Sequence, residues 1–376
     1  MSSGVLVRVI LGATLGSVVC SCGGGGSSGT PPPPPPPPPT SSTLLYATNA
    51  TAGTIDGLTV NTTTGVPTPI SGSPSPDGSA AVAVAIDPRK RFLYVAASSG
   101  EIRGYLIDGS TSKLSAISGS PFSTSAQSAA ITVDPAGQFV LTANGSSNTV
   151  SVFKIASSGA LTEVAGSPFA AGSDPSAIVV AAGKFVYAAN TVSGTLSAYQ
   201  MDATSGALTA VAGSPFAAGT SPNGLVVDGN GTHVYASGSQ PNALSGFSID
   251  AGTGALTAIA GSPFAASYPV SSPVIDGEGK RLHAADGTDV DCFSVNSTTG
   301  ALTELGLSTT NGKAVALALD GPDNFLYVLD NVNNQLEVFS VTPADGSLAL
   351  IAGSPFPLFS GSGSQTLGPN AIAVAH

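Results

Sequence analysis

Apolar and polar residues follow a pattern that recurs along most of the chain. One clear copy spans residues 175–221 and contains four short segments separated by polar turns. The segment 177–180 is continuously apolar, 184–189 and 195–201 alternate around aromatic residues, and 208–216 closes the unit. Short runs with this alternation are typical of β-strands. Each copy therefore predicts four strands.

The copies follow one another at nearly constant spacing. A Gly-Ser-Pro triplet marks the end of each unit, starting at Gly72, Gly119, Gly166, Gly213, Gly261 and Gly353, with Gly306-Leu307-Ser308 as a degraded copy. A repeat of about 47 residues that occurs seven times indicates small sheets stacked around a central axis. We therefore expect an all-β fold, a seven-bladed β-propeller with four-stranded antiparallel blades.

The residues between the expected strands have the chemistry of turns. Asp-Pro-x-Gly sequences separate the first and second strands, as at 134–137, and Thr-Gly pairs separate the third and fourth, as at 253–254. Aspartate accepts hydrogen bonds from nearby amides, and glycine adopts positive φ without strain. These turns support antiparallel pairing of consecutive strands.

The two ends of the repeated region are incomplete in complementary ways. Residues 44–49 match a second strand with no first strand before it, whereas residues 371–374 match a first strand with nothing after it. We expect the C-terminal strand to be the innermost strand of a blade whose outer strands come from residues 44 to about 75. This closure would remove a free sheet edge.

The first 42 residues have a different composition from the repeats. Residues 1–22 predict a lipoprotein signal peptide: Arg8 precedes an apolar run too short to span a bilayer, and small residues precede Cys22. The segment 19–22 resembles a bacterial lipobox with Cys22 as the lipidated residue; a plain secretory signal is the alternative.

Residues 23–42, rich in Gly, Ser and Pro, predict a disordered stalk before the propeller at 43–376. We expect an extracytoplasmic protein of the bacterial cell envelope that contacts the membrane only through its lipid anchor.

Charge and cysteine content narrow the choice of partners. Only 9% of the residues are charged, and the formal net charge is −11 at pH 7. An acidic chain without a basic stripe is a poor partner for nucleic acid, so we expect no nucleic-acid binding. Cys292 is the only cysteine within the repeats, which excludes a disulfide inside the propeller. We interpret Cys292 as a small buried residue. We also expect the protein to be a monomer.

The recurring elements Asp-Pro-x-Gly-Lys, Phe-x-Tyr-x-x-Asn and Thr-Gly-x-Leu resemble the lactonase-like seven-bladed propellers. These include 6-phosphogluconolactonases, muconate-lactonising enzymes and YVTN-repeat surface proteins, and the resemblance covers all seven units. It implies a site at the channel mouth, on the face formed by the loops from second to third strand and from fourth to first strand.

Lys313, with Arg103 at the edge, is the cation expected at this mouth, whereas Lys280 and Arg281 fall on turns of the opposite face. A phosphorylated lactone would need several cations at the mouth.

The histidines inside the strands replace aromatic residues of other copies. His283 stands where most copies have tyrosine, and His233 where most have phenylalanine. We interpret both as packing residues, with general-base catalysis as the alternative.

A ring of polar residues follows the second strands and is expected at the mouth. These candidate ligand-binding residues are Asn49, Asn144, Asn190, Asp286 and Asp330, together with Lys313. They could bind an uncharged polar ligand or simply cap turns. Asp286, Asp289 and Asp291 have oxygen ligands that could hold calcium, a solvated acidic loop being the alternative. No other cofactor is expected.

Two functional hypotheses follow. The first is an envelope-anchored binding or scaffold module for a polar small molecule, a glycan or a protein. The second, implied by the family resemblance, is a lactonase-like hydrolase that opens an unphosphorylated sugar or aromatic lactone. Lactone opening requires a base or metal and a charge stabiliser, which would come from Asp286, Asp291, Asp330 and Lys313. Whether the chain is an enzyme is left open.

Overall fold

The computed structural model describes residues 42–78, 80–124, 126–240, 242–358 and 371–375. The predicted signal peptide, its Cys22 and residues 23–41 of the predicted stalk lie outside these ranges. Within them, no helix is long and apolar enough to cross a membrane, and helical structure is confined to the one-turn 3₁₀ segment η1 (Gly145–Ser147). The described residues form an all-β fold.

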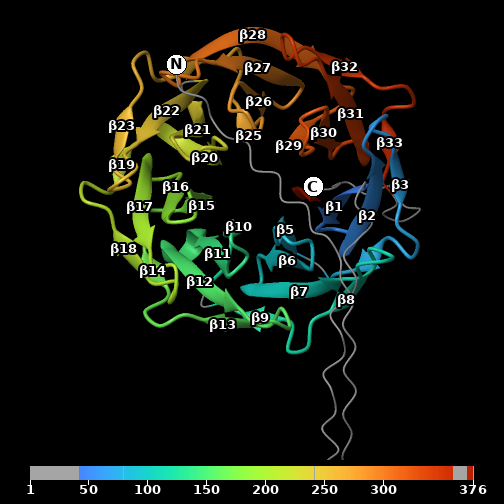
Figure 1. Cartoon of the computed structure of the whole chain (residues 1–376), viewed down its shortest axis with the longest axis horizontal. Coiled ribbons are helices and arrows are strands. Elements are labelled where there is room, and N and C mark those ends of the chain that lie inside the picture. The colour runs from blue at the N-terminus through green and yellow to red at the C-terminus, as the bar shows by residue number, and fades with distance from the viewer. Residues whose placement is uncertain (1–41, 79, 125, 241, 359–370, 376) are drawn as a thin grey trace, which may run out of the picture. The chain divides into compact units, whose positions relative to one another are not determined.

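Seven antiparallel sheets are arranged in a ring around a common axis (Figure 1). Blades 2, 3 and 4 each contain an inner strand, two middle strands and an outer strand in two pieces. Blade 2 comprises β5 (Ala81–Ile86), β6 (Phe92–Ala97), β7 (Glu101–Ile107), β8 (Leu114–Ala116) and β9 (Phe122–Ser123). Blade 3 comprises β10 (Ala130–Val133), β11 (Phe139–Asn144), β12 (Thr149–Ile155), β13 (Leu161–Glu163) and β14 (Phe169–Ala170). Blade 4 comprises β15 (Pro175–Ala181), β16 (Phe185–Asn190), β17 (Thr195–Met201), β18 (Leu208–Ala210) and β19 (Phe216–Ala217).

The same order continues in the second half of the ring. Blade 5 comprises β20 (Thr220–Val227), β21 (His233–Gln240), β22 (Ala243–Ile249), β23 (Leu256–Ala258) and β24 (Phe264–Ala265). Blade 6 comprises β25 (Ser271–Ile275), β26 (Arg281–Ala285), β27 (Asp289–Val295) and β28 (Leu302–Thr309). Blade 7 comprises β29 (Ala314–Leu319), β30 (Phe325–Asp330), β31 (Gln335–Val341), β32 (Leu348–Leu350) and β33 (Phe356–Pro357).

Blade 1 is built from both ends of the repeated region, as the sequence predicted. Its inner strand is β34 (Ala371–Ala375), which pairs antiparallel with β1 (Ser42–Asn49). The third strand is β2 (Thr54–Asn61), and the outer strand consists of two pieces, β3 (Pro67–Pro69) and β4 (Ser75–Pro76). The register places Leu45 opposite Val374 and Tyr46 opposite Ala373. In Figure 1 the C-terminal strand lies on the inner side of β1 and completes the ring.

The outer strand differs from the expectation of one continuous segment. In six blades it is interrupted at the Gly-Ser-Pro triplet, where the Ser-Pro peptide bond is cis. The serine hydroxyl replaces the missing strand contact by accepting a hydrogen bond from the third strand; in blade 4, Ala198 N donates to Ser214 Oγ at 2.9 Å. Blade 6 lacks the proline, and its outer strand β28 runs unbroken along β27.

The hydrophobic core is divided among the contacts between blades. Each of seven clusters of buried residues joins one pair of adjacent blades. Because the sheets pack face to face, inner and middle strands are apolar on both sides, which explains the continuous apolar runs.

A tyrosine on the second strand links each of four blades to the next one. The hydroxyl of Tyr187 donates to the carbonyl oxygen of Gly254 in the turn after the third strand of blade 5, at 2.8 Å. Tyr46, Tyr94 and Tyr235 make the equivalent contact with their neighbouring blades. The hydroxyl of Tyr327 has no partner within the described ranges.

The glycine of the same turn is required by its close contact with an aromatic ring. A Cβ on Gly254, whose φ is +74°, would lie 2.4 Å from the ring of Phe185. Any side chain would therefore clash, in addition to the strain of a left-handed backbone. This packing explains why Thr-Gly recurs in the sequence.

We expect that the chain without residues 371–376 shows no cooperative unfolding transition near the melting temperature of the native chain. The deletion takes away the inner strand of blade 1 and exposes the edge of β1, including the fully buried Leu45. Thermal unfolding followed by circular dichroism measures the effect, with the rim variant Leu350→Ser as the control because Leu350 is exposed. Unchanged melting of the truncated chain would contradict the closure.

Candidate functional site

The inner strands enclose a cavity in the central channel, and few of the side chains that line it are polar. Its volume is about 340 Å³, and its polar lining consists of Asn223, Ser271 and Ser272 among small apolar residues. Ser272 Oγ accepts a hydrogen bond from Leu317 N at 3.1 Å, and Asn223 Oδ1 accepts one from Ser237 Oγ at 2.8 Å. Among the described residues, the lining includes no charged side chain, which suits an uncharged ligand.

The predicted ring contains three buried asparagines, of which Asn49 caps a turn. Asn49 Oδ1 accepts hydrogen bonds from Thr51 N and Ala52 N at 3.1 and 2.9 Å. The side-chain amides of Asn144 and Asn190 donate instead to hydroxyl groups of their own blades. All three asparagines are completely buried, each in a different blade, so their amides serve local structure. Ligand binding by this ring stays a prediction.

Asp330 is also held by its own turn. Its Oδ1 accepts hydrogen bonds from Lys313 N at 3.0 Å and Val332 N at 2.9 Å, and its Oδ2 accepts one from Gln335 Nε2 at 2.9 Å. Burial alone would raise the pKa of Asp330, but these hydrogen bonds outweigh it and hold the pKa below the usual value. The side chain of Lys313 itself is exposed.

The three aspartates predicted to bind calcium do not form a ligand cluster. Asp286 Oδ1 accepts a hydrogen bond from Thr288 N at 3.0 Å, and Asp289 Oδ2 accepts one from Thr288 Oγ1 at 3.1 Å. Across the residues that the structure describes, no group of three or more His, Cys, Asp or Glu side chains is placed to hold a metal ion. The calcium prediction therefore gains no support from this geometry.

A second polar ring lies on the third strands, and sequence reasoning missed it. Its members pair with the second-strand residue two positions before the first polar ring: Asp56, Arg103, Ser151, Ser197, Ser245, Asp291 and Glu337. Some of them hold the connection that enters their blade; Gly172 N donates to Ser197 Oγ, and Asn311 N donates to Glu337 Oε1. The available signal was the replacement of serine by charged residues in blades 6, 7, 1 and 2.

The cation of this second ring is neutralised by acidic neighbours. Arg103 Nη1 lies 3.0 Å from Asp77 Oδ2, and its guanidinium also pairs with Glu101. Tyr105 donates to the other oxygen of Asp77 at 2.8 Å. Arg103 therefore attaches the connection between blades 1 and 2 to the third strand of blade 2.

Asp291 is the exceptional acid in this second ring. Its side chain is fully buried, and neither carboxyl oxygen has a hydrogen-bond partner among the described residues. Burial raises the pKa of Asp291 to about 7, and the negative charges of Asp286, Glu304 and Asp289 add to the shift. It shares its strand face with Phe293, which packs against blade 5. A carboxyl that exchanges a proton near neutral pH is suited to acid–base chemistry.

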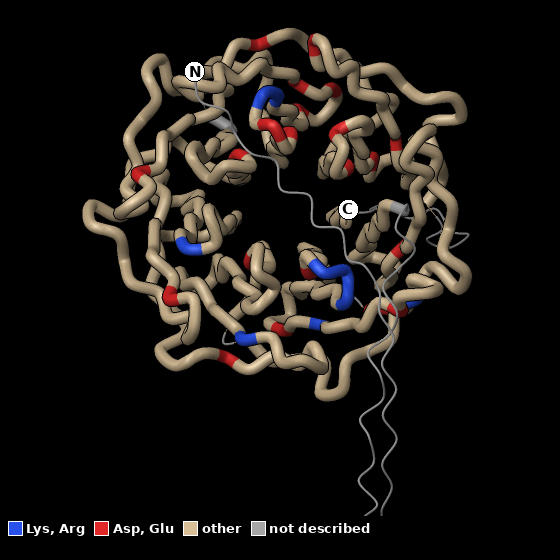
Figure 2. Tube along the Cα trace, viewed as in Figure 1, with Lys and Arg blue, Asp and Glu red and all other residues tan. Residues whose placement is uncertain are grey.

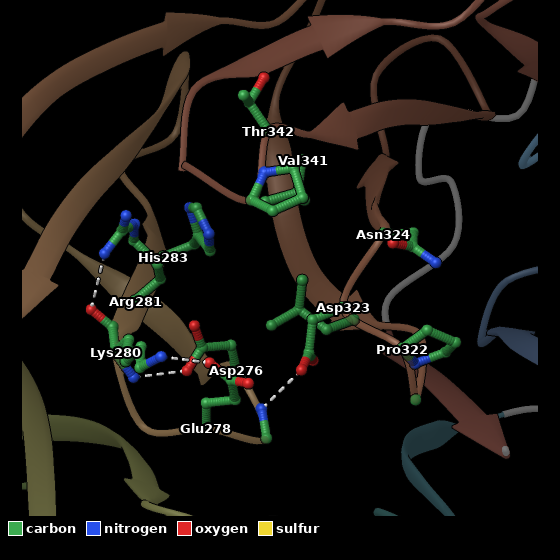
Figure 3. A pocket seen from close by; sticks show the side chains of 14 residues that line it. Asp276, Glu278, Lys280, Arg281, His283, Pro322, Asp323, Asn324, Val341 and Thr342 are labelled. Atoms are coloured by element: carbon green, nitrogen blue, oxygen red, sulfur yellow. Dashed lines mark hydrogen bonds and ion pairs between the residues drawn. The ribbon is translucent and has the colours of Figure 1, made fainter. Parts of the chain in front are cut away.

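The opposite face contains a larger cavity between blades 6 and 7, of about 500 Å³ (Figure 3). Arg281 and His283 of β26 lie on one side, and Asp323 and Asn324 of blade 7 lie across from them. Lys280 lines it as well. The sequence placed both cations on this face, away from the mouth. Figure 2 shows how few charged positions the ring has elsewhere.

His283 is buried as predicted, but the strand pattern does not indicate the cavity beside it. Its Nδ1 lies 3.2 Å from Cys292 Sγ, and its Nε2 has no hydrogen-bond partner in the described part of the chain. Burial, with a smaller contribution from the charge of Arg281, lowers the pKa of His283 to about 4, so the imidazole is neutral at pH 7. Burial also raises the pKa of the Cys292 thiol to about 12, so it is a weak nucleophile. His233 instead pairs with Asp228 at 3.0 Å and packs beneath Gly300.

Comparison of the sequence with known families gives a match that covers more than half of the chain. The matching family is described as lactonase, 7-bladed beta-propeller, and the matched segments are residues 43–173, 107–220 and 163–274. The chain belongs to this lactonase family. No protein with a curated description matches the chain in sequence.

Solved structures of low sequence identity share the fold of this family member. A candidate 6-phosphogluconolactonase from Bacteroides uniformis is 19% identical with a TM-score of 0.76, covering 89% of this chain and 99% of its own. The periplasmic gluconolactonase PpgL of Pseudomonas aeruginosa is 17% identical with a TM-score of 0.73, again covering 89% and 99%. At such identity the likeness establishes the propeller and leaves the substrate of this chain open.

We expect Asp291→Asn to remove one component of the pH dependence of stability. The pKa of Asp291 is raised in the folded chain, so its contribution is fully present below about pH 4 and is lost as the pH rises through about 7. Between these values the free energy of unfolding should fall by up to about 1.4 kcal/mol per pH unit. Urea titrations of both chains from pH 4 to pH 8 measure the difference. Parallel pH profiles would show that Asp291 titrates normally.

Proposed function

We propose that this chain hydrolyses a neutral lactone at the channel mouth, with Asp291 as the general base. Membership of the lactonase family supports lactones as the substrate class. The observation that carries the proposal is the buried carboxyl of Asp291, whose oxygens have no hydrogen-bond partner among the described residues and whose pKa is about 7. A general base is most effective when its pKa lies near the working pH.

The reaction requires few groups. A water molecule attacks the lactone carbonyl, the bond between the carbonyl carbon and the ring oxygen breaks, and a carboxylate and a hydroxyl group result. Asp291 accepts the proton of the water. Because its carboxyl lies beneath the surface, the proton would travel through an intervening water molecule. The exposed ammonium of Lys313 would stabilise the negative charge on the carbonyl oxygen.

The polarity of the channel argues for an unphosphorylated substrate. In the described part of the chain, the cavity of about 340 Å³ is lined by apolar residues, two serines and one asparagine, without a charged side chain. Arg103, the other cation expected near the mouth, is paired with Asp77 and Glu101. A phosphate group would therefore lack the bidentate arginine contacts that usually hold it. Neutral sugar lactones and aromatic lactones fit better.

We expect the purified propeller to open glucono-1,5-lactone or dihydrocoumarin, with a rate that rises with pH through about 7. Loss of a general base typically costs a factor of about 10²–10⁴, so Asp291→Asn should lower kcat/KM by that amount and remove the pH dependence. Proton release in a weakly buffered assay measures the rate.

Asp289→Asn is the matched control, because Asp289 lies on the same strand and its Oδ2 accepts a hydrogen bond from Thr288 in the adjacent turn. It should retain activity. Repeating the assay with calcium and with EDTA tests the metal prediction. No turnover of any neutral lactone, with saturable binding retained, would overturn the proposal and favour the binding-module hypothesis.

We also propose that the chain is exported and anchored through a lipid on Cys22. The support is the sequence of residues 1–22 and the Gly, Ser and Pro-rich segment after it. In a bacterial host, Cys22→Ala should move the protein from the membrane fraction to the soluble fraction. Cys20→Ala is the control and should leave it in the membrane. Membrane retention of the Cys22 variant would rule out this anchor.

A further inference from the structure

The cavity between blades 6 and 7 arises where the repeat changes two of its residues. In blade 4, Phe185 packs on Gly254 and the hydroxyl of Tyr187 donates to the carbonyl oxygen of the same glycine. Blade 6 has Arg281 and His283 at these two positions. An imidazole is shorter than a phenol, so His283 does not reproduce the contact with the turn of the next blade.

A groove of similar size shows what this change does. Across blades 2, 3 and 4, a groove of about 450 Å³ on the same face is lined by surface side chains such as Arg91, Gln138 and Lys154. Tyr94, which is hydrogen-bonded to Gly159, is not part of its lining. The cavity between blades 6 and 7 instead reaches the second strand, because His283 belongs to its wall.

Two buried polar atoms at this wall lack partners among the described residues. They are Nε2 of His283, a residue with 1% exposure, and Nε of Arg281. The terminal nitrogens of Arg281 donate to Ala344 O at 2.8 Å and to Lys280 O at 3.3 Å, so the guanidinium is fixed in place. A buried polar atom without a partner is costly, and a bound ligand would supply the missing hydrogen bonds.

The other charges at the cavity already have partners. Lys280 Nζ lies 2.6 Å from Glu278 Oε2, and Asp323 Oδ2 accepts a hydrogen bond from Gly277 N at 2.8 Å. Asp276 accepts one from the backbone of Lys280 at 2.6 Å. Three carboxylates face two cations here, so a charged ligand of either sign would meet like charges.

We propose that this cavity binds an uncharged, hydroxyl-rich ligand of monosaccharide size. A hydroxyl group can both donate and accept, so it can pair with His283 Nε2 in either tautomer and accept from Arg281 Nε. Leu319, Pro322, Val341 and Pro343 provide apolar surface for the C–H face of a sugar ring. A volume of about 500 Å³ lies within the range of small-molecule sites. The proposal is independent of the reaction proposed at the channel mouth.

The test uses histidine labelled with ¹⁵N in the whole propeller. The chain has three histidines, so the imidazole signal of His283 can be assigned with single variants. D-Glucose, D-galactose, D-xylose and myo-inositol are titrated in turn, with gluconate and glucose 6-phosphate as charged analogues. We expect a saturable shift of the His283 signal with at least one neutral compound, and at least tenfold weaker binding of the charged analogues.

Two variants that restore the residues of the repeat test whether the ligand binds in this cavity. His283→Tyr brings back the phenol that links the other blades and should abolish binding, measured by calorimetry, without loss of stability. Arg281→Phe provides a second test if the tyrosine variant folds poorly. His233→Phe is the matched control, because it also restores the repeat but lies outside the cavity, and it should bind as the native chain does.

The proposal is overturned by any of three results. They are the absence of saturable binding of every neutral compound to the native chain, tighter binding of a charged analogue, and unchanged binding in the folded His283→Tyr or Arg281→Phe variant.

Discussion

The ring depends on a contact that each of several blades makes with the next. A tyrosine hydroxyl reaches the carbonyl oxygen of a turn in the neighbouring blade, while the preceding aromatic ring packs against the glycine of that turn. One such hydrogen bond contributes about 0.5–1.5 kcal/mol, and its recurrence around the ring also fixes the spacing between blades. This constraint explains the most regular features of the sequence: the Phe-x-Tyr pairs, the Thr-Gly turns and the nearly constant length of the repeat.

Several positions that depart from the repeat carry the charged and buried polar side chains of the proposed sites. Blades 3, 4 and 5 carry serine at the inner position of the third strand, whereas Asp291, Glu337, Asp56 and Arg103 occupy it in blades 6, 7, 1 and 2. Blade 6 also loses both aromatic residues of the contact between blades and the proline of its outer strand. Residues that break a local rule without a structural gain are often functional. Blade 6 is therefore the part of this lactonase-family propeller where departures from the repeat concentrate, and both sites proposed above draw on its residues.

The sequence was sufficient for the architecture but only partly for the sites. Blade number and ring closure follow from periodicity, because each copy specifies its strands and turns locally and the unmatched segments at 44–49 and 371–374 complement each other. The break in the outer strand was missed, because the sequence indicates one strand that ends at the Gly-Ser-Pro triplet, whereas the strand stops before the triplet and resumes after it. The sequence named Asp291 as a candidate, but its burial without hydrogen-bond partners and the cavity beside His283 could not be predicted, because both depend on which side chains of neighbouring blades come together. Alternation assigned His283 to the interior correctly, yet one strand pattern cannot show that the next blade leaves space beside it.

The pairing of β34 with β1 also has a consequence for the order in which the fold is completed. Leu44 faces Ala375, so the contacts that complete blade 1 join residues at nearly opposite ends of the polypeptide. A ribosome makes β1 before blades 2 to 7 and β34 after them. Blades 2 to 7 can each form from a continuous stretch of nascent chain, but the sheet of blade 1 must wait until residues 371–375 have been made. Until then, the edge of β1 remains open and available to other strands in the cell.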